Sequence, residues 1–248
     1  MPETISVIAA GATVFVAAAI QGTTGFGFVI VAAPVLTMFI DPQIAVPVLV
    51  LQGFLIGGTL LARVYKVVEL KRIWLLVLSG LGCVPVGTYA LIHVDPAVIR
   101  ILIGMVVGVT AIGLFVGARR RFTKEKLASI VVGGSSGLLV GSTGLAGAPV
   151  ILFFTNQAMS PNQFRANITM HLQAVSCAAL ISFLVSGVLN WGAVTLTLQL
   201  LPAGLAGLVF GMFIHGRVSE RIFRWLAFSV LFVAVGGSLS TGFSEILA

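Results

Sequence analysis

The chain has 248 residues, of which 58% are hydrophobic and only 8% are charged, and its formal net charge at pH 7 is +7. Such a composition excludes a soluble globular domain and is typical of a polytopic helical membrane protein. The positive charge does not require a nucleic-acid partner. Nearly all Lys and Arg residues fall in short stretches between apolar segments, where anionic lipid headgroups are sufficient partners.

The first half of the chain begins with an apolar segment over 5–39 that contains the string Gly22-Thr23-Thr24-Gly25. Three apolar stretches follow at 43–62, 71–92 and 97–117. Each is long enough to cross most of a hydrocarbon core of about 30 Å. A basic stretch at 119–126 then separates the two halves, and we expect it to be a cytoplasmic linker.

The second half presents the same order of elements. A segment over 127–156 contains Gly141-Ser142-Thr143-Gly144, and apolar stretches follow at 166–186, 193–214 and 221–242. Asp41-Pro42 matches Ser160-Pro161, and Leu51-Gln52 matches Leu172-Gln173. The offset between matched blocks drifts only from 119 to 124 residues, except for Pro34 and Pro149, which are 115 residues apart. We therefore predict one transport domain over 1–248, with repeat one at 1–118 and repeat two at 127–248.

The charges of equivalent loops indicate how the repeats are oriented. The basic turn at 63–72 corresponds to the uncharged turn at 186–192, and the turn that holds Asp95 corresponds to the basic turn near Arg217. Equivalent loops are then expected on opposite sides of the membrane, as in an inverted-topology repeat. The fold predicted is an all-α polytopic membrane protein in a bacterial-type inner membrane, with both termini periplasmic.

With three spans in each repeat, the segments 5–39 and 127–156 must each return to the side on which they start. We expect each to be a re-entrant helical hairpin with a glycine-rich tip near the middle of the membrane, and two short spans are the alternative for 5–39. The arms of the second hairpin are expected to have about 13 and 10 residues, or roughly 15 to 20 Å at the helical rise.

The string Gly22-Thr-Thr-Gly-Phe-Gly-Phe with Pro34, and its partner Gly141-Ser-Thr-Gly-Leu-Ala-Gly with Pro149, resemble the duplicated glycine-rich signature of the TauE/SafE family. The resemblance covers the whole chain. Members of that family are described as sulfite and organosulfonate exporters or permeases. The resemblance implies a secondary carrier for a small oxyanion, foremost sulfite or a small organosulfonate, and not an enzyme.

The chemistry of the tips agrees with an anion. Non-helical backbone at membrane depth lines a cavity or is buried in protein, and the first amides of the following helix carry partial positive charge. The hydroxyls are expected at cap positions before the second arm, where they either cap the helix or donate to a ligand. Glycines that merely allow close helix packing are the alternative. The candidate residues of the tips are Gln21, Gly22, Thr23, Thr24, Gly25, Gly27, Gly141, Ser142, Thr143 and Gly144.

Polar side chains within the next spans are further candidates for substrate binding, because such groups usually face a cavity or a partner helix. They are Gln52, Asn167, His171 and Gln173. His171 is a candidate for proton coupling, and a neutral histidine hydrogen-bonded across helices is an equal alternative. Arg165 either attracts the anion or anchors its helix at the interface, and we favour anchoring.

Two other functions remain to be weighed. A channel for an anion or small solute is the main alternative, since the sequence does not reveal whether two gates can open together. An intramembrane serine protease built on Ser142 and His171 is disfavoured, because the first repeat has no histidine partner and one catalytic dyad gives no reason for duplication. We expect no metal and no cofactor. The partners expected are the anion and membrane lipid, and a homodimer is one option for assembly.

Overall fold

The structure is a computed structural model that describes residues 2–116, 125–157 and 159–214. Within these ranges the chain forms helices, turns and loops, and no strand. The helices in chain order are α1 (Pro2–Thr24), α2 (Phe28–Leu36), α3 (Pro42–Val64), the short 3-10 helix η1 (Tyr65–Val67), α4 (Leu70–His93), α5 (Pro96–Val116), α6 (Glu125–Thr143), α7 (Gly147–Thr155), α8 (Pro161–Val185) and α9 (Trp191–Ile214).

Five of these helical stretches are long and apolar enough to cross a membrane: Pro42–Val67, Leu70–His93, Pro96–Phe115, Pro161–Val185 and Trp191–Ile214. They confirm an all-helical, multi-pass membrane protein, and their bounds agree with the spans expected from hydropathy to within a few residues. The sixth expected span, 221–242, lies outside the described residues, as does most of the linker at 119–126. The last two linker residues, Glu125 and Lys126, already belong to α6.

Each glycine-rich segment folds as a long helix followed by a short one. α1 has 23 residues and α2 has 9, while α6 has 19 and α7 has 9. The expected first arm of about 13 residues in the second segment is therefore wrong. Its helix continues past Gly141 because this glycine fits closely against α4, and because the hydroxyls that follow it bond back to the preceding turn.

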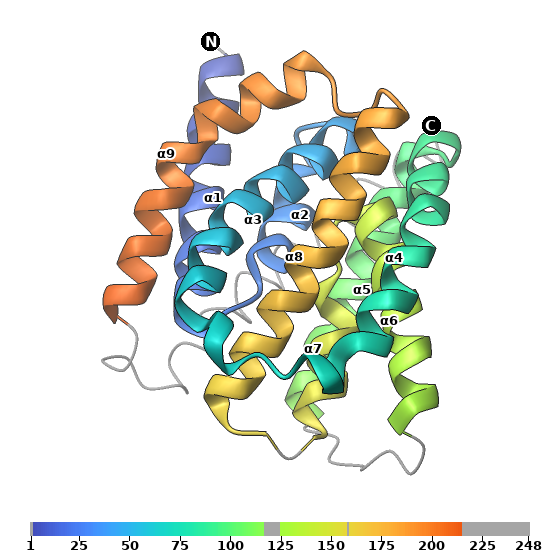
Figure 1. The fold of residues 1–248 in the computed structure, drawn as a ribbon. Coiled ribbons are helices and arrows are strands. Elements are labelled where there is room, and N and C mark those ends of the chain that lie inside the picture. Colours follow the sequence, from blue (N-terminus) through green and yellow to red (C-terminus); the bar gives the residue numbers. More distant parts are fainter. Residues whose placement is uncertain (1, 117–124, 158, 215–248) are drawn as a thin grey trace.

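The long helices α1 and α6 each pack on a helix from the other half of the chain. α1 lies along α9, and α6 lies along α4 (Figure 1). Glycines make both contacts close. A methyl group added at Gly211 would overlap the carbonyl oxygen of Ala19, and one added at Gly87 would overlap that of Leu138. Small residues allow helix backbones to approach in this way. Each half of the chain thus packs a long arm on a helix of the other half.

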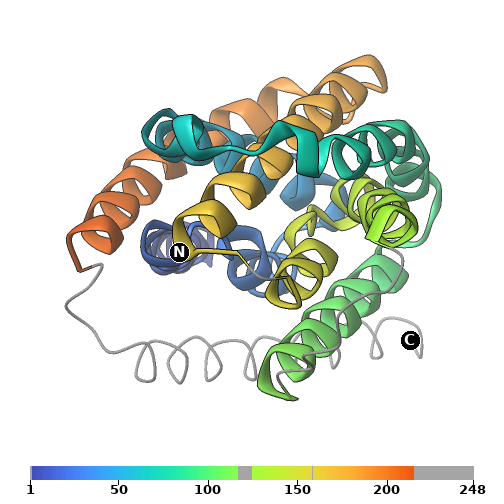
Figure 2. The same ribbon diagram turned by 60° about the horizontal axis from the view of Figure 1, so that its bottom comes forward.

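Most of the basic residues that the structure describes lie at one end of the bundle, and Arg100 in the first part of α5 is the exception among them. α3 ends at the bottom of Figure 1, where α4, α6 and α8 begin, whereas α1 and α9 begin at the top. The basic stretch 63–72 and Lys126 belong to the lower helix ends. Figure 2 is turned so that this end comes forward, and it shows the start of α8 beside α7 and the junction of α3 with α4.

Candidate functional site

The breaks between the long and short helices have matching backbone geometry. Gly25 follows α1 with φ 89°, and Gly144 follows α6 with φ 78°, in the left-handed region that disfavours side chains. The amide of each glycine donates to the carbonyl four residues earlier, at 2.7 Å and 3.1 Å respectively. The short helices then start anew, α2 with Gly27 and α7 with Ala146 at the N-cap position.

The hydroxyl groups of the tips close the first arms, so their expected placement at the caps of the second arms is wrong. Thr24 Oγ1 donates to the carbonyl four residues earlier at 2.8 Å and accepts the amide two residues later at 3.3 Å. Thr143 Oγ1 makes the same two bonds at 2.8 Å and 3.4 Å. Thr23 and Ser142 donate back within their helices. These hydroxyls stabilise the breaks through local backbone bonds.

A cavity of about 50 Å³ lies between the two breaks, and it is bordered by the N-terminal ends of both α2 and α7. α1, α3 and α8 complete its wall. Its lining residues are Gln21, Gly25, Gly27, Phe28, Val29, Ile30, Gly53, Gly57, Gly144, Leu145, Ala146, Gly147, Thr169, Leu172, Gln173 and Ser176. Several of these form pairs 119 positions apart, such as Gly25 with Gly144 and Gly27 with Ala146.

The electrostatics of this cavity come from backbone and amide groups, because none of its lining residues is ionisable. Each helix N-terminus is equivalent to roughly half a positive charge and presents amides without intrahelical partners. The lining amide of Gln173 donates to the Phe54 carbonyl at 3.0 Å. Gln21 is only 5% exposed, and its Oε1 has no hydrogen-bond partner among the described residues. The N–H groups at the two helix ends can therefore act as donors to a small anion, whereas the unpartnered atom of Gln21 is an acceptor.

α8 holds the first break in place. Arg165 Nη2 donates to the Gly22 carbonyl at 3.3 Å, and Thr169 Oγ1 donates to the Gly25 carbonyl at 3.4 Å. The Arg165 Nε atom lies 3.2 Å from the point where a Cβ of Gly25 would be. A full positive charge thus lies beside the first tip. The sequence favoured a role for Arg165 in anchoring its helix. The one sequence signal for a shared contact with the first break is that Arg165 and Thr169 are four residues apart and so lie on one face of α8.

His171 holds the second break through a serine that the sequence analysis missed. Both side chains are fully buried, and His171 Nε2 lies 2.8 Å from Ser136 Oγ. The same hydroxyl donates to the carbonyl of Ala146, the N-cap residue of α7, at 2.7 Å. Gln52 is also buried, with 1% of its surface exposed, but neither end of its amide has a partner among the described residues.

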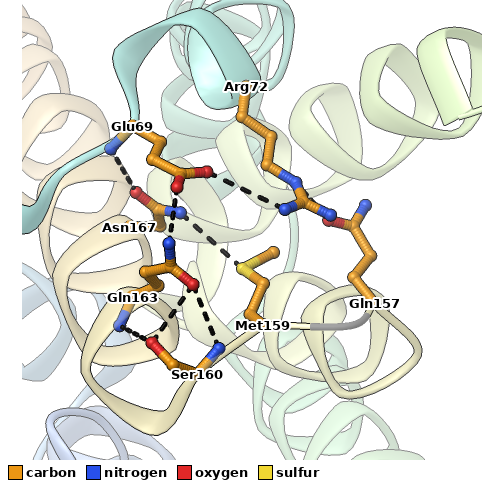
Figure 3. A network of polar contacts seen from close by, with 7 residues as sticks. All are labelled: Glu69, Arg72, Gln157, Met159, Ser160, Gln163 and Asn167. Atoms are coloured by element: carbon orange, nitrogen blue, oxygen red, sulfur yellow. Dashed lines mark hydrogen bonds and ion pairs between the residues drawn. The ribbon is translucent and has the colours of Figure 1, made fainter.

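Asn167 points away from the cavity, toward the basic end of the bundle. Its Oδ1 accepts the Glu69 amide at 2.8 Å, and its Nδ2 lies 3.7 Å from Met159 Sδ (Figure 3). Asn167 is fully buried, and the amide that it accepts belongs to the N-cap residue of α4. It therefore links the α3–α4 junction to α8 rather than lining the cavity.

Asn167 belongs to a larger polar network at this end (Figure 3). Gln163 Nε2 donates to Glu69 Oε1 at 2.6 Å, and Arg72 Nε donates to Gln157 Oε1 at 3.2 Å. Glu69 and Arg72 also form an ion pair at 3.8 Å. Ser160 and Gln163 close a capping box at the start of α8. The network joins the start of α4 in the first half of the chain to the α7–α8 turn in the second.

The structure thus places the predicted site residues in four different surroundings. Those that line the cavity are Gln21, Gly25, Gly27, Gly144 and Gln173. Those that serve packing or local bonding around it are Gly22, Thr23, Thr24, Gly141, Ser142, Thr143 and His171, while Asn167 lies in the network at the basic end and Gln52 lies between α3 and α9. Thr169 and Ser176 line the cavity without having been predicted.

The apolar spanning helices define a multi-pass membrane protein, and a small cavity between two interrupted helices is an arrangement found in transporters. The family model of the sulfite exporter TauE/SafE matches residues 10–239, so the chain belongs to this family of membrane transporters. No curated protein and no solved structure matches the chain.

Proposed function

We propose that this protein is a secondary carrier for a small oxyanion, foremost sulfite or a small organosulfonate. The observation that carries the proposal is that the N-termini of α2 and α7 border one cavity. Two helix ends supply N–H donors and partial positive charge from opposite sides of the ligand. Arg165, beside Gly25, adds to the positive potential.

The carrier is proposed to consist of two inverted repeats with re-entrant hairpins. The contacts of Gly22 and Gly141 favour this, because each glycine faces the same three positions of its partner helix. A methyl group at Gly22 would meet Leu208, Gly211 and Met212, and one at Gly141 would meet Val84, Gly87 and Thr88. The second set precedes the first by 124 residues throughout. With the basic end cytoplasmic, both termini are proposed to be periplasmic in a bacterial-type inner membrane.

Alternating access supplies the proposed transport step, in which the cavity opens to one side at a time. The network of Glu69, Arg72, Gln157, Gln163 and Asn167 ties the two halves together at the basic end. We propose that it closes the cytoplasmic side in this state and separates when that side opens. Positions 119 residues before Gln163 and Asn167 carry Ile44 and Val48, so these two polar positions of the network are not repeated in the first half.

A thermal-shift panel on purified protein tests the substrate assignment. Sulfite, sulfate, thiosulfate, taurine, isethionate and sulfoacetate are compared, because a ligand that binds only the folded state raises its melting temperature by mass action. At least one sulfur oxyanion should raise it in a concentration-dependent manner, with chloride at equal ionic strength as the control. A panel without any shift, together with no anion uptake into proteoliposomes, contradicts the proposal.

A channel is distinguished from a carrier by flux measurements. Uptake through a carrier saturates with substrate concentration and shows counterflow, since each turnover requires a conformational change. Linear uptake without counterflow would assign a channel to the same cavity.

A further inference from the structure

The environments of Gln52 and His171 match residue by residue, although Gln52 was first aligned with Gln173. A methyl group at Gly80 would approach Val175, Gly133 and His171 at 2.9, 3.2 and 3.3 Å. One at Gly204 would approach Ile56, Val14 and Gln52 at 2.8, 3.3 and 2.8 Å. Each residue of the second group lies 119 positions before its counterpart in the first. Gln52 is thus the structural counterpart of His171.

The two counterparts differ in how their polar atoms are satisfied. In the second half, the Ser136 hydroxyl bridges His171 Nε2 and the Ala146 carbonyl. The residue 119 positions before Ser136 is Ala17, which has no hydroxyl and is fully buried. Both amide atoms of Gln52 are accordingly buried without a hydrogen-bond partner among the described residues. A buried amide left in this condition is costly, and it is typically explained by a bound group or a functional role.

Gln52 is not itself a lining residue of the cavity, but it lies on α3 next to residues that are. Its neighbour Gly53 and, one turn later, Gly57 are the residues of α3 that line the cavity. Gln21, one helical turn after Ala17 on α1, also lines the cavity and has an unpartnered Oε1. At the second break the Ser136 hydroxyl bridges His171 Nε2, and His171 Nδ1 alone of that ring lacks a partner among the described residues. At the first break both amide atoms of Gln52 lack one, so this half of the site has a spare side-chain N–H donor.

We propose that Gln52 is a ligand-binding residue whose amide donates to an oxygen atom of the transported anion, in the place that the Ser136 hydroxyl takes in the second half. The inference rests on the proposed function. Gln52 Nε2 supplies two N–H donors, and an oxyanion oxygen is a strong acceptor for them. The anion is then held asymmetrically, with side-chain contacts at the first break and mainly helix-end amides at the second.

Two substitutions at this position test the proposal through opposite effects on stability and binding. Gln52→Leu removes the unpartnered amide at similar size, so the ligand-free melting temperature should rise by about 2–4 °C. Anion affinity should fall about tenfold. Ala17→Ser offers Gln52 a hydroxyl partner and should act in the same two directions without removing the amide. Gln173→Leu is the matched control, because its amide is bonded to Phe54, and this variant should have a lower melting temperature.

Calorimetry with the anion selected by the thermal-shift panel, and melting curves without it, give the two readouts. An anion that binds Gln52→Leu and Ala17→Ser as tightly as wild type overturns the inference and leaves the proposed function intact. A fall in melting temperature for Gln52→Leu as large as that for Gln173→Leu also overturns it, since the amide would then be structurally satisfied. Failure of the wild type to bind any anion instead overturns the proposed function.

Discussion

The glycines that end α1 and α6 have a conformational role at the residue scale. Gly144 has φ 78°, and a Cβ there would also lie 3.1 Å from the Val29 side chain at the start of α2. Replacement by a larger residue therefore strains the backbone and pushes the two short helices apart. At a glycine with a similar φ but open space around the added Cβ, the same substitution would cost only the backbone strain.

Gly144→Ala should lower the free energy of unfolding by about 1–2 kcal/mol, the cost of a side chain in the left-handed region. It should also weaken anion binding by about tenfold, because the amides of α7 move away from the cavity. Gly187→Ala is the control, since Gly187 has φ 74° in the α8–α9 turn with nothing within 4 Å of an added Cβ. Equal loss of binding in both variants, read by calorimetry and thermal unfolding, would exclude a direct role for the second break.

Proton coupling through His171 stays a prediction. One ring nitrogen is held by Ser136, and Nδ1 is buried without a partner among the described residues. If the ring carries the proton, His171→Gln should keep anion binding and abolish the dependence of uptake on a pH gradient. Ser136→Ala removes the hydrogen bond but leaves a titratable ring, so it should retain that dependence. Gradient-dependent uptake by His171→Gln would assign the histidine a structural role.

At the scale of elements, hydropathy predicts the long spans well, because a lipid-facing helix must be apolar over its whole length. It predicts the interrupted helices less well. A hydroxyl after a glycine can either begin a helix as a cap or end one by bonding back, and Thr24 and Thr143 do the latter. The sequence alone leaves both options open. The contact of Arg165 with Gly22 likewise joins residues 143 positions apart.

The network at the basic end predicts the effect of a cross-link between the halves. In a background without Cys83 and Cys177, Glu69→Cys with Gln163→Cys places thiols where side chains meet at 2.6 Å. Because the bridge would prevent the proposed opening of the basic end, oxidation or a short bifunctional reagent should arrest transport, and reduction should restore it. Anion binding to the closed state should persist.

A cross-link within one half is the control for that experiment. Glu69→Cys with Arg72→Cys joins residues that form an ion pair three positions apart. This bridge does not connect the two halves, so transport should continue. Transport that also continues with the first bridge would show that the network does not separate during the cycle.

At the scale of the whole molecule, the sequence predicts a duplication but does not determine the register of the two repeats. Matching Gln52 with Gln173 paired identical residue types, whereas the contacts around Gly80 and Gly204 pair Gln52 with His171. Identical residue types are a poor guide to equivalent positions where the two halves differ in polarity. The packing neighbours of a residue are the better criterion, and they are known only from a three-dimensional structure.

Cysteine accessibility tests the orientation of the whole molecule. Lys66→Cys, in η1 at the basic end, should react with a membrane-impermeant thiol reagent only from the cytoplasmic side. Asn190→Cys, at the start of α9, should react only from the periplasmic side. Labelling of both positions from the same side contradicts the inverted arrangement, because α3–α4 and α8–α9 are its equivalent junctions.

The exchanged packing of α1 on α9 has a consequence for synthesis. The glycine surface that accepts α1 includes Gly207 and Gly211, close to 190 residues after the segment that it contacts. At about 5–20 residues per second, α1 emerges on the order of ten seconds or more before its partner helix exists. During that interval the face of α1 that packs on α9 has no partner helix. α1 therefore waits longer for its main packing partner than α4 waits for α6, and the nascent chain needs the insertion machinery most while that face of α1 is uncovered.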